Sequence, residues 1–197
     1  MSSSESPTPR RRLSREDRLR QLLDVAWQLV RDEGTEALTL GRLAELAGVT
    51  KPVVYDHFVT RAGLLTALYE DFDARQDRVF ANAIAASSAT LEGRAWVIAE
   101  SYVDCVLLQG REIPGVIAAL SSSPELEALK RQYEAIFLDK CRAALSPFGR
   151  LSQAGLRAML GAAEALSQAA ASGEISREEA QQELLATILA MVNRGRL

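Results

Sequence analysis

A short run of side chains near residue 50 could bind an anion. Thr50 supplies a hydroxyl, Lys51 an ammonium group and Tyr55, four residues after the lysine, a phenol. If Thr50 begins a helix, the unpaired amides of the first turn and the positive end of the helix dipole favour a phosphate group there. Lys51 and Tyr55 then lie one turn apart on one face, so we expect phosphate contacts from all three residues.

The residues around this run predict two short helices that cross with little space between them. The segment 39–58 has the sequence TLGRLAELAGVTKPVVYDHF. Ala44 lets the second helix approach, and Gly48 permits a tight turn. The apolar residues expected to face inwards are Leu40, Leu43, Val49 and Val54. With Thr39 and Thr50 as N-cap residues, the segment predicts a helix-turn-helix.

The rest of the chain also predicts helices, with Gly and Pro at the joints, so the expected fold class is all-α with about nine helices. The predicted helices are Arg15–Gly34, Leu40–Ala47, one from the cap Thr50 to Phe58, one from the cap Thr60 to Ala86, Leu91–Leu108, Ile113–Leu120, Pro124–Leu145, Ser152–Ala171 and Arg177–Asn193. Three parts of the chain follow: a flexible basic arm (1–13), a helix-turn-helix domain (14–60) and a larger helical domain (61–197).

Composition excludes several classes of protein. The chain has 197 residues, of which 48% are hydrophobic, and two cysteines, which are too few for a secreted disulfide framework. A single histidine excludes a multi-histidine metal site, and no catalytic constellation or phosphate-binding glycine loop is present, so we expect no metal, no cofactor and no enzyme activity. We find no signal peptide and no apolar stretch of membrane-spanning length, so we expect a cytoplasmic protein that has no membrane partner.

Charge is distributed unevenly along the chain. The net charge is −3, but residues 1–61 hold 10 Lys and Arg against 9 Asp and Glu, with a basic run at Arg10, Arg11 and Arg12. Residues 62–197 hold 13 Lys and Arg against 17 Asp and Glu. The overall charge therefore does not exclude a nucleic-acid partner.

The string GVTKPVVYDHF at 48–58, followed by Arg61 and Leu64-Leu65, resembles the DNA-binding head of TetR-type (tetracycline-repressor-like) regulators. The resemblance extends over about residues 14–70. It implies that the head binds double-stranded DNA, that the helical body binds an inducer, and that the last two helices form a four-helix dimer interface.

The chain departs from the family pattern at three positions of this head. Pro52 replaces a small residue, Asp56 a neutral or aromatic one, and Arg61 the usual lysine. Asp56 repels phosphate, so we expect its side chain to face a base edge or pair with a cation. For two residues a structural role is as well supported as contact with DNA: His57 as a packing residue at the helix end and Arg42 as a solvated surface charge. The residues expected to contact DNA are Arg12, Arg42, Thr50, Lys51, Pro52, Val53, Tyr55, Asp56, His57 and Arg61.

The middle helices mix aromatic and polar residues within their apolar pattern, which is typical of a small-molecule site. The residues expected to contact a ligand are Trp96, Glu100, Tyr102, Cys105, Gln109, Ile117, Tyr133 and Phe137. Core packing remains an alternative for each of them, and the identity of the ligand cannot be deduced from these residue types.

Two apolar stripes on the last two helices are the expected dimer interface, although a purely intramolecular core is the alternative. The residues assigned to this interface are Leu156, Met159, Leu160, Ala163, Leu185, Ile188, Leu189 and Val192. A dimer would place two recognition helices roughly 34 Å apart, one turn of DNA.

The function predicted is that of a ligand-responsive transcriptional regulator: a repressor that binds a palindromic operator as a homodimer and is released by a small-molecule effector. One alternative is a DNA-binding architectural protein with no effector. A second is an all-α enzyme or carrier, in which the three-helix head serves only for packing.

Overall fold

Most helices of this chain begin at a hydroxyl side chain that caps the first turn. The backbone amide three residues later donates to the hydroxyl of Ser14, Thr39, Thr60, Thr90, Ser152 or Ser176. At Ser176 the carboxylate of Glu179 also accepts from the cap's own amide, which completes a capping box. The helix starts predicted from the caps Thr39 and Thr60 are thereby confirmed.

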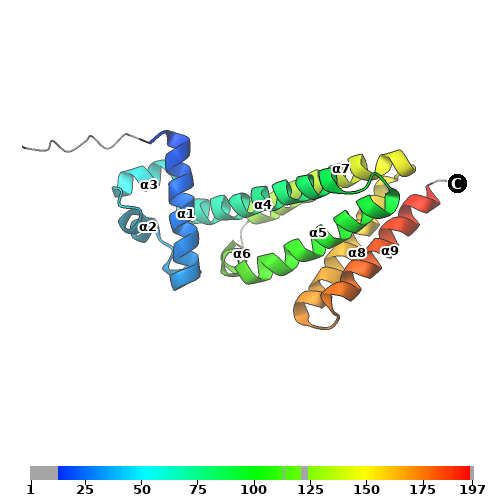
Figure 1. Cartoon of the computed structure of the whole chain (residues 1–197). Coiled ribbons are helices and arrows are strands. Elements are labelled where there is room, and N and C mark those ends of the chain that lie inside the picture. The colour runs from blue at the N-terminus through cyan, green and yellow to red at the C-terminus, as the bar shows by residue number, and fades with distance from the viewer. Residues whose placement is uncertain (1–12, 113, 121–123, 196–197) are drawn as a thin grey trace, which may run out of the picture. The chain divides into compact units, whose positions relative to one another are not determined.

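The computed structural model describes residues 13–112, 114–120 and 124–195. Figure 1 shows an all-helical chain, and no strand occurs in these ranges. The elements are α1 (Arg15–Glu33), the 3₁₀ turn η1 (Thr35–Ala37), α2 (Leu40–Leu46), α3 (Lys51–Phe58), α4 (Arg61–Ala86), α5 (Leu91–Glu112), α6 (Pro114–Leu120), α7 (Pro124–Leu145), the 3₁₀ turn η2 (Ser146–Phe148), α8 (Gln153–Ser172) and α9 (Arg177–Arg194). The predicted all-α class is confirmed, and the main difference is that α5 continues one turn beyond Leu108.

The chain divides into two compact units between Leu68 and Tyr69. The first unit contains α1, α2, α3 and the beginning of α4, and we call it the head. We expected its end near residue 60, but Leu64 and Leu68 at the beginning of α4 are fully buried. Arg61 also donates hydrogen bonds to the carbonyl oxygens of Leu38 (2.9 Å) and Thr35 (2.8 Å). The first two turns of α4 are therefore part of the head.

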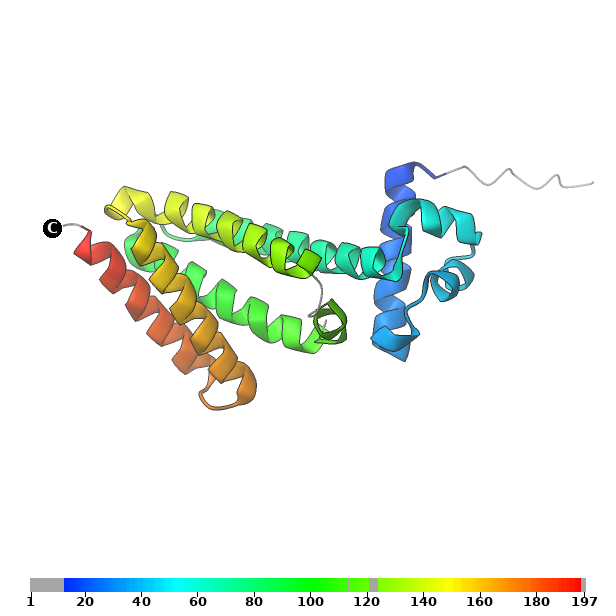
Figure 2. The same cartoon turned by 180° about the vertical axis from the view of Figure 1, so that it is seen from behind.

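The second unit, which we call the body, is built around α5, α8 and α9. These three helices pack against one another, and their buried side chains include Ile98, Val103, Met159 and Ile188. Within this unit α4 and α7 lie side by side in both views (Figures 1 and 2), and an ion pair between Asp77 and Lys140 joins them. In the described part of the chain, no helix is both long enough and apolar enough to span a bilayer.

Candidate nucleic-acid interface and ligand pocket

The helix α3 divides its side chains cleanly between the head core and the outside. Val54 is 0% exposed and Phe58 is buried, whereas Lys51 is exposed and Tyr55 is 50% exposed. The preceding turn depends on Gly48, whose φ of +63° is one that residues with a side chain rarely adopt. The structure therefore forms the predicted helix-turn-helix and presents Lys51 and Tyr55 outwards.

Thr50 stands at the N-cap position of α3, but its hydroxyl makes no capping hydrogen bond. The amide of Val53 donates instead to the Thr50 carbonyl oxygen at 3.0 Å, and Pro52 has no amide hydrogen. This differs from the six capping hydroxyls described above. The Thr50 hydroxyl therefore remains available, beside the Lys51 amide and ammonium group, for an external phosphate oxygen.

Three other predicted contact residues are already engaged within the head. Arg42 pairs with Glu33 at 2.7 Å and with Glu45 at 3.5 Å, and the hydrogen bond and charge of Glu33 raise the pKa of its guanidinium. Arg61 holds two backbone carbonyl groups. Asp56 lies 3.9 Å from Arg15, so it pairs with a cation, which is one of the two expected outcomes.

The remaining predicted contact residues lie at the edge of the same surface. Pro52 is exposed, and Val53 is half-buried. His57 is also half-buried, with its ring 6.1 Å from that of Phe58. The predicted contact Arg12 and the basic arm before it lie outside the described residues.

A pocket of about 610 Å³ opens in the body. Side chains from α4, α5, α7 and α8 line it, and its volume lies within the range of roughly 300–1,000 Å³ usual for small-molecule sites. Six predicted ligand contacts line this pocket, namely Glu100, Tyr102, Cys105, Gln109, Tyr133 and Phe137.

Two predicted ligand contacts, Trp96 and Ile117, do not line the pocket. Trp96 is 38% exposed. It precedes Cys105 by nine residues, which at 100° per residue places it on the opposite side of α5. Ile117 belongs to the short helix α6, and no described side chain of this helix lines the pocket.

Sequence reasoning missed the contribution of α4. Tyr69, Asp73, Gln76 and Phe80 line the pocket from successive turns of this helix. Their spacing of four, three and four residues marks a single helical face, and two polar residues interrupt its apolar pattern. That interruption was a signal that could have identified the face.

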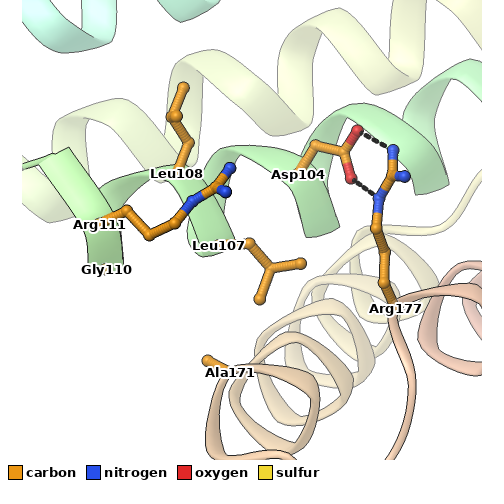
Figure 3. Close-up of a pocket in the computed structure, with 7 residues that line it drawn as sticks. All are labelled: Asp104, Leu107, Leu108, Gly110, Arg111, Ala171 and Arg177. Atoms are coloured by element: carbon orange, nitrogen blue, oxygen red, sulfur yellow. Dashed lines mark hydrogen bonds and ion pairs between the residues drawn. The ribbon is translucent and has the colours of Figure 1, made fainter.

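A second hollow, shown in Figure 3, borders the same part of α5. There the carboxylate of Asp104 accepts two hydrogen bonds from Arg177 of α9, both at 2.6 Å. The side chain of Gln181 donates a third at 2.9 Å. Asp104 lines both hollows, whereas Arg177 lines only the second one.

Burial keeps the thiol and the phenol hydroxyl groups of the pocket protonated. It raises the pKa of Cys105 to about 12, with a smaller contribution from the negative charge of Asp73. Burial is also the main cause that raises the pKa of Tyr69 to about 12 and that of Tyr102 still further. Among the described residues, no group of three or more His, Cys, Asp or Glu side chains could hold a metal ion.

Most residues of the predicted dimer stripe lie inside the body itself. Leu156, Met159, Leu160, Ala163, Ile188 and Val192 are buried in its core, and Leu185 and Leu189 are half-buried. The intramolecular alternative therefore holds for these six side chains. The outward face of α8 instead carries the exposed small residues Ala158, Gly161 and Ala165.

The family model described as "Bacterial regulatory proteins, tetR family" matches residues 22–68. The HTH-type transcriptional activator FasR of Mycolicibacterium smegmatis is 39% identical over 59 residues, which are 30% of this chain and 27% of that protein. The HTH-type transcriptional regulator BetI of Cronobacter sakazakii is 28% identical over 118 residues, 58% of each chain. The matched part of this chain spans less than two thirds of either relative.

The fold is shared over a much larger part of the chain. A transcriptional regulator of the TetR/AcrR family from Thermobifida fusca superposes with a TM-score of 0.64 at 24% identity. The superposition covers 88% of this chain and 97% of that one. The shared fold therefore extends through the body.

Proposed function

Because this chain belongs to the TetR family of bacterial transcriptional regulators, we propose that it represses transcription by binding a palindromic operator as a homodimer. We propose further that a small molecule in the body pocket releases it. In this proposal the protein acts in the cytoplasm, on double-stranded DNA, and performs no catalysis.

The DNA-binding proposal rests on which side chains of α3 are buried and which are exposed. The core side of this helix is buried, its outer side presents Lys51 and Tyr55, and the Thr50 hydroxyl is uncommitted. Lys51 forms no ion pair with any described residue, so no internal partner has to be displaced before it neutralises a phosphate. Arg42 and Arg61 serve instead to hold the head together in this proposal.

The homodimer is supported by the outward faces of α8 and α9. Ala158, Gly161 and Ala165 recur at intervals of three and four residues on α8, and all three are exposed. Small residues at this spacing let the backbones of two helices approach closely. On α9 the half-buried Leu185 and Leu189 provide apolar area that a second copy would cover.

The pocket supports effector control, because α4 contributes residues to both units. Leu64 and Leu68 of this helix are buried in the head, and Tyr69 and Asp73 line the pocket. A ligand that favours a conformation in which the two heads no longer match the operator would weaken DNA binding. By reciprocity, operator DNA would weaken ligand binding by the same factor.

The test is selection of a binding consensus from random duplexes, followed by titration of the selected DNA. We expect a two-fold symmetric consensus and an affinity that falls steeply with salt concentration. Lys51→Ala should weaken binding and reduce the slope of log affinity against log salt by about 2, because the homodimer loses one phosphate contact from each of its two heads. Adding Tyr55→Ala should weaken it further.

Arg78→Ala is the matched control, because this exposed cation lies on α4 in the body, outside the proposed DNA surface. It should leave operator affinity and salt slope unchanged. If no sequence is enriched, or if Lys51→Ala and Arg78→Ala behave alike, α3 is not the reading element. A consensus without symmetry would contradict the homodimer.

A further inference from the structure

The charges that line the body pocket are strongly unbalanced. Its walls carry carboxylates from α4, α5, α7 and α8, and these belong to Asp73, Asp77, Glu100, Asp104, Glu134 and Glu164. Among the described residues of the lining, one side chain is cationic, that of Lys130. Asp73, Glu100, Asp104 and Glu134 are half-buried, and Asp77 and Glu164 are exposed. Partial burial of charges of one sign is unfavourable unless cations compensate them, so nearby cations are expected.

Cations just outside the pocket compensate half of these carboxylates. Lys140 pairs with Asp77, Arg177 holds Asp104 through two hydrogen bonds, and Arg157 lies 3.2 Å from Glu134. These three ion pairs belong to the wall of the pocket, and their carboxylates already have cationic partners.

The other three carboxylates, those of Asp73, Glu100 and Glu164, form no ion pair or hydrogen bond with any described residue. They project from three different helices into one cavity. Three of the six carboxylates are therefore neutralised by cations of the pocket wall, and the other three produce a negative field inside the pocket.

The effect of this field is visible on neighbouring groups. After burial, the next cause that raises the pKa of Cys105 and of Tyr133 is the charge of Asp73. For Tyr102 it is the charge of Glu164. The thiol and the phenols stay neutral and therefore offer hydrogen bonds but no positive charge.

Aromatic rings line the same pocket. The rings of Tyr69 and Tyr133 lie 6.0 Å apart, and Phe137 lies 5.1 Å from Tyr102 and 5.8 Å from Phe80. Aromatic faces attract cations and also pack against flat apolar groups. A hydrated inorganic ion would gain little from such a lining.

We propose that this pocket selects an organic cation whose positive charge is carried on an aromatic or otherwise apolar body. The carboxylates of Asp73 and Glu164 supply the charge complement, and the rings of Tyr69, Tyr102 and Phe137 bind the body of the ligand. That such a cation acts as the effector rests on the function proposed above. The proposal that such a cation binds to the pocket does not depend on that function.

The test compares two probes of almost the same shape and opposite charge, tetraphenylphosphonium and tetraphenylborate. Binding to the full-length chain is measured by isothermal titration calorimetry. We expect the phosphonium to bind at least tenfold more tightly than the borate. The double variant Asp73→Asn with Glu164→Gln should bind the phosphonium at least tenfold more weakly. It should also show a smaller difference in affinity between the phosphonium and the borate.

The matched control is Asp139→Asn, which removes an exposed carboxylate of α7 outside the pocket and should leave phosphonium affinity unchanged. Circular dichroism melting checks that each variant folds. Equal affinity for the two probes, or an equal loss in Asp139→Asn and in the double variant, would overturn the proposal.

A separate titration with operator DNA distinguishes this inference from the proposed function. If the chain binds its consensus but does not prefer the phosphonium, the ligand class is wrong and the regulator stands. If the phosphonium binds through Asp73 and Glu164 but the chain selects no DNA, the pocket assignment stands and the regulator is wrong.

Discussion

The cations of the head show that charge by itself does not identify a DNA contact. Lys51, Arg42 and Arg61 are equivalent in a charge count, and all three were predicted to contact DNA. The structure separates them, since Arg42 pairs with Glu33 and Arg61 binds two carbonyl oxygens. The guanidinium of Arg61 donates to backbone carbonyl groups and so fixes the chain between η1 and α2. Replacing Arg61 would therefore primarily disturb the structure of the head and not a DNA contact.

Asp73 makes a pH dependence of cation binding predictable. Burial, with the charge of Asp77 as the next cause, raises the pKa of Asp73 from its usual 3.8 to about 6, and Lys140 opposes this rise. The other groups around it, Tyr133 and Cys105, are neutral. A bound cation favours the carboxylate, so binding below about pH 6 must release a proton.

We therefore expect the affinity for tetraphenylphosphonium, which does not titrate, to increase as pH rises through about 6 and to level off above 7. The gain between pH 5 and 7.5 is about tenfold for a single carboxyl of this pKa. Calorimetry across this range measures it, with Asp73→Asn as the control that should flatten the profile. An affinity that falls with rising pH would contradict the role given to Asp73.

At the scale of elements, the junction between α3 and α4 is strained. Val59 has φ 59° and ψ −52°, and the amide of Thr60 donates to the carbonyl oxygen of Phe58 at 2.5 Å, which together define a γ-turn. A β-branched residue rarely adopts positive φ. Val59 is 70% exposed, so no buried contact of its side chain compensates this strain.

We expect Val59→Gly to raise the free energy of unfolding by about 1 kcal/mol, because relief of backbone strain exceeds the added entropy of the unfolded chain. Urea denaturation measures the change. Val79→Gly, at an exposed position inside α4, is the control and should lower stability by about 0.5 kcal/mol through helix propensity. A loss of stability in both variants would show that Val59 is not strained.

Most helix bounds could be predicted because local chemistry determines them. Hydroxyl caps, Gly48 and Pro124 mark positions where a helix begins or a turn forms, and the observed bounds agree within a few residues. The direction in which a helical face points is not a local property. The stripe with Leu156 and Ile188 was therefore correctly predicted as apolar but assigned to a partner instead of to the chain's own core.

The same argument explains the errors in the ligand pocket. A mixture of aromatic and polar residues marked α5 and α7, but it could not show which face of α5 borders the pocket, that of Cys105 or that of Trp96. Asp73 and Gln76 were not among the predicted ligand contacts, although both lie in the helix predicted from Thr60 to Ala86. Their roles depend on which helices surround the same cavity, and that is decided by packing between distant segments.

At the scale of the whole molecule, the proposed dimer depends on the small residues of the outward face of α8. Gly161 is the most informative position, because a Cβ atom added there would meet no described atom of the same chain within 4 Å. We therefore expect Gly161→Arg to fold normally but to prevent a second copy from approaching. Analytical ultracentrifugation should show a wild-type mass of twice 21.5 kDa and a single-chain mass for the variant.

Gly110→Arg introduces the same side chain at another exposed helical glycine with open space around it, so it should remain dimeric. Operator binding adds a second measurement. A single head contacts only one half-site, so Gly161→Arg should lose most of its operator affinity while Gly110→Arg keeps it. A Gly161→Arg protein that stays dimeric would place the interface on another surface. A monomeric variant that binds as tightly as the wild type would show that one head is sufficient for recognition.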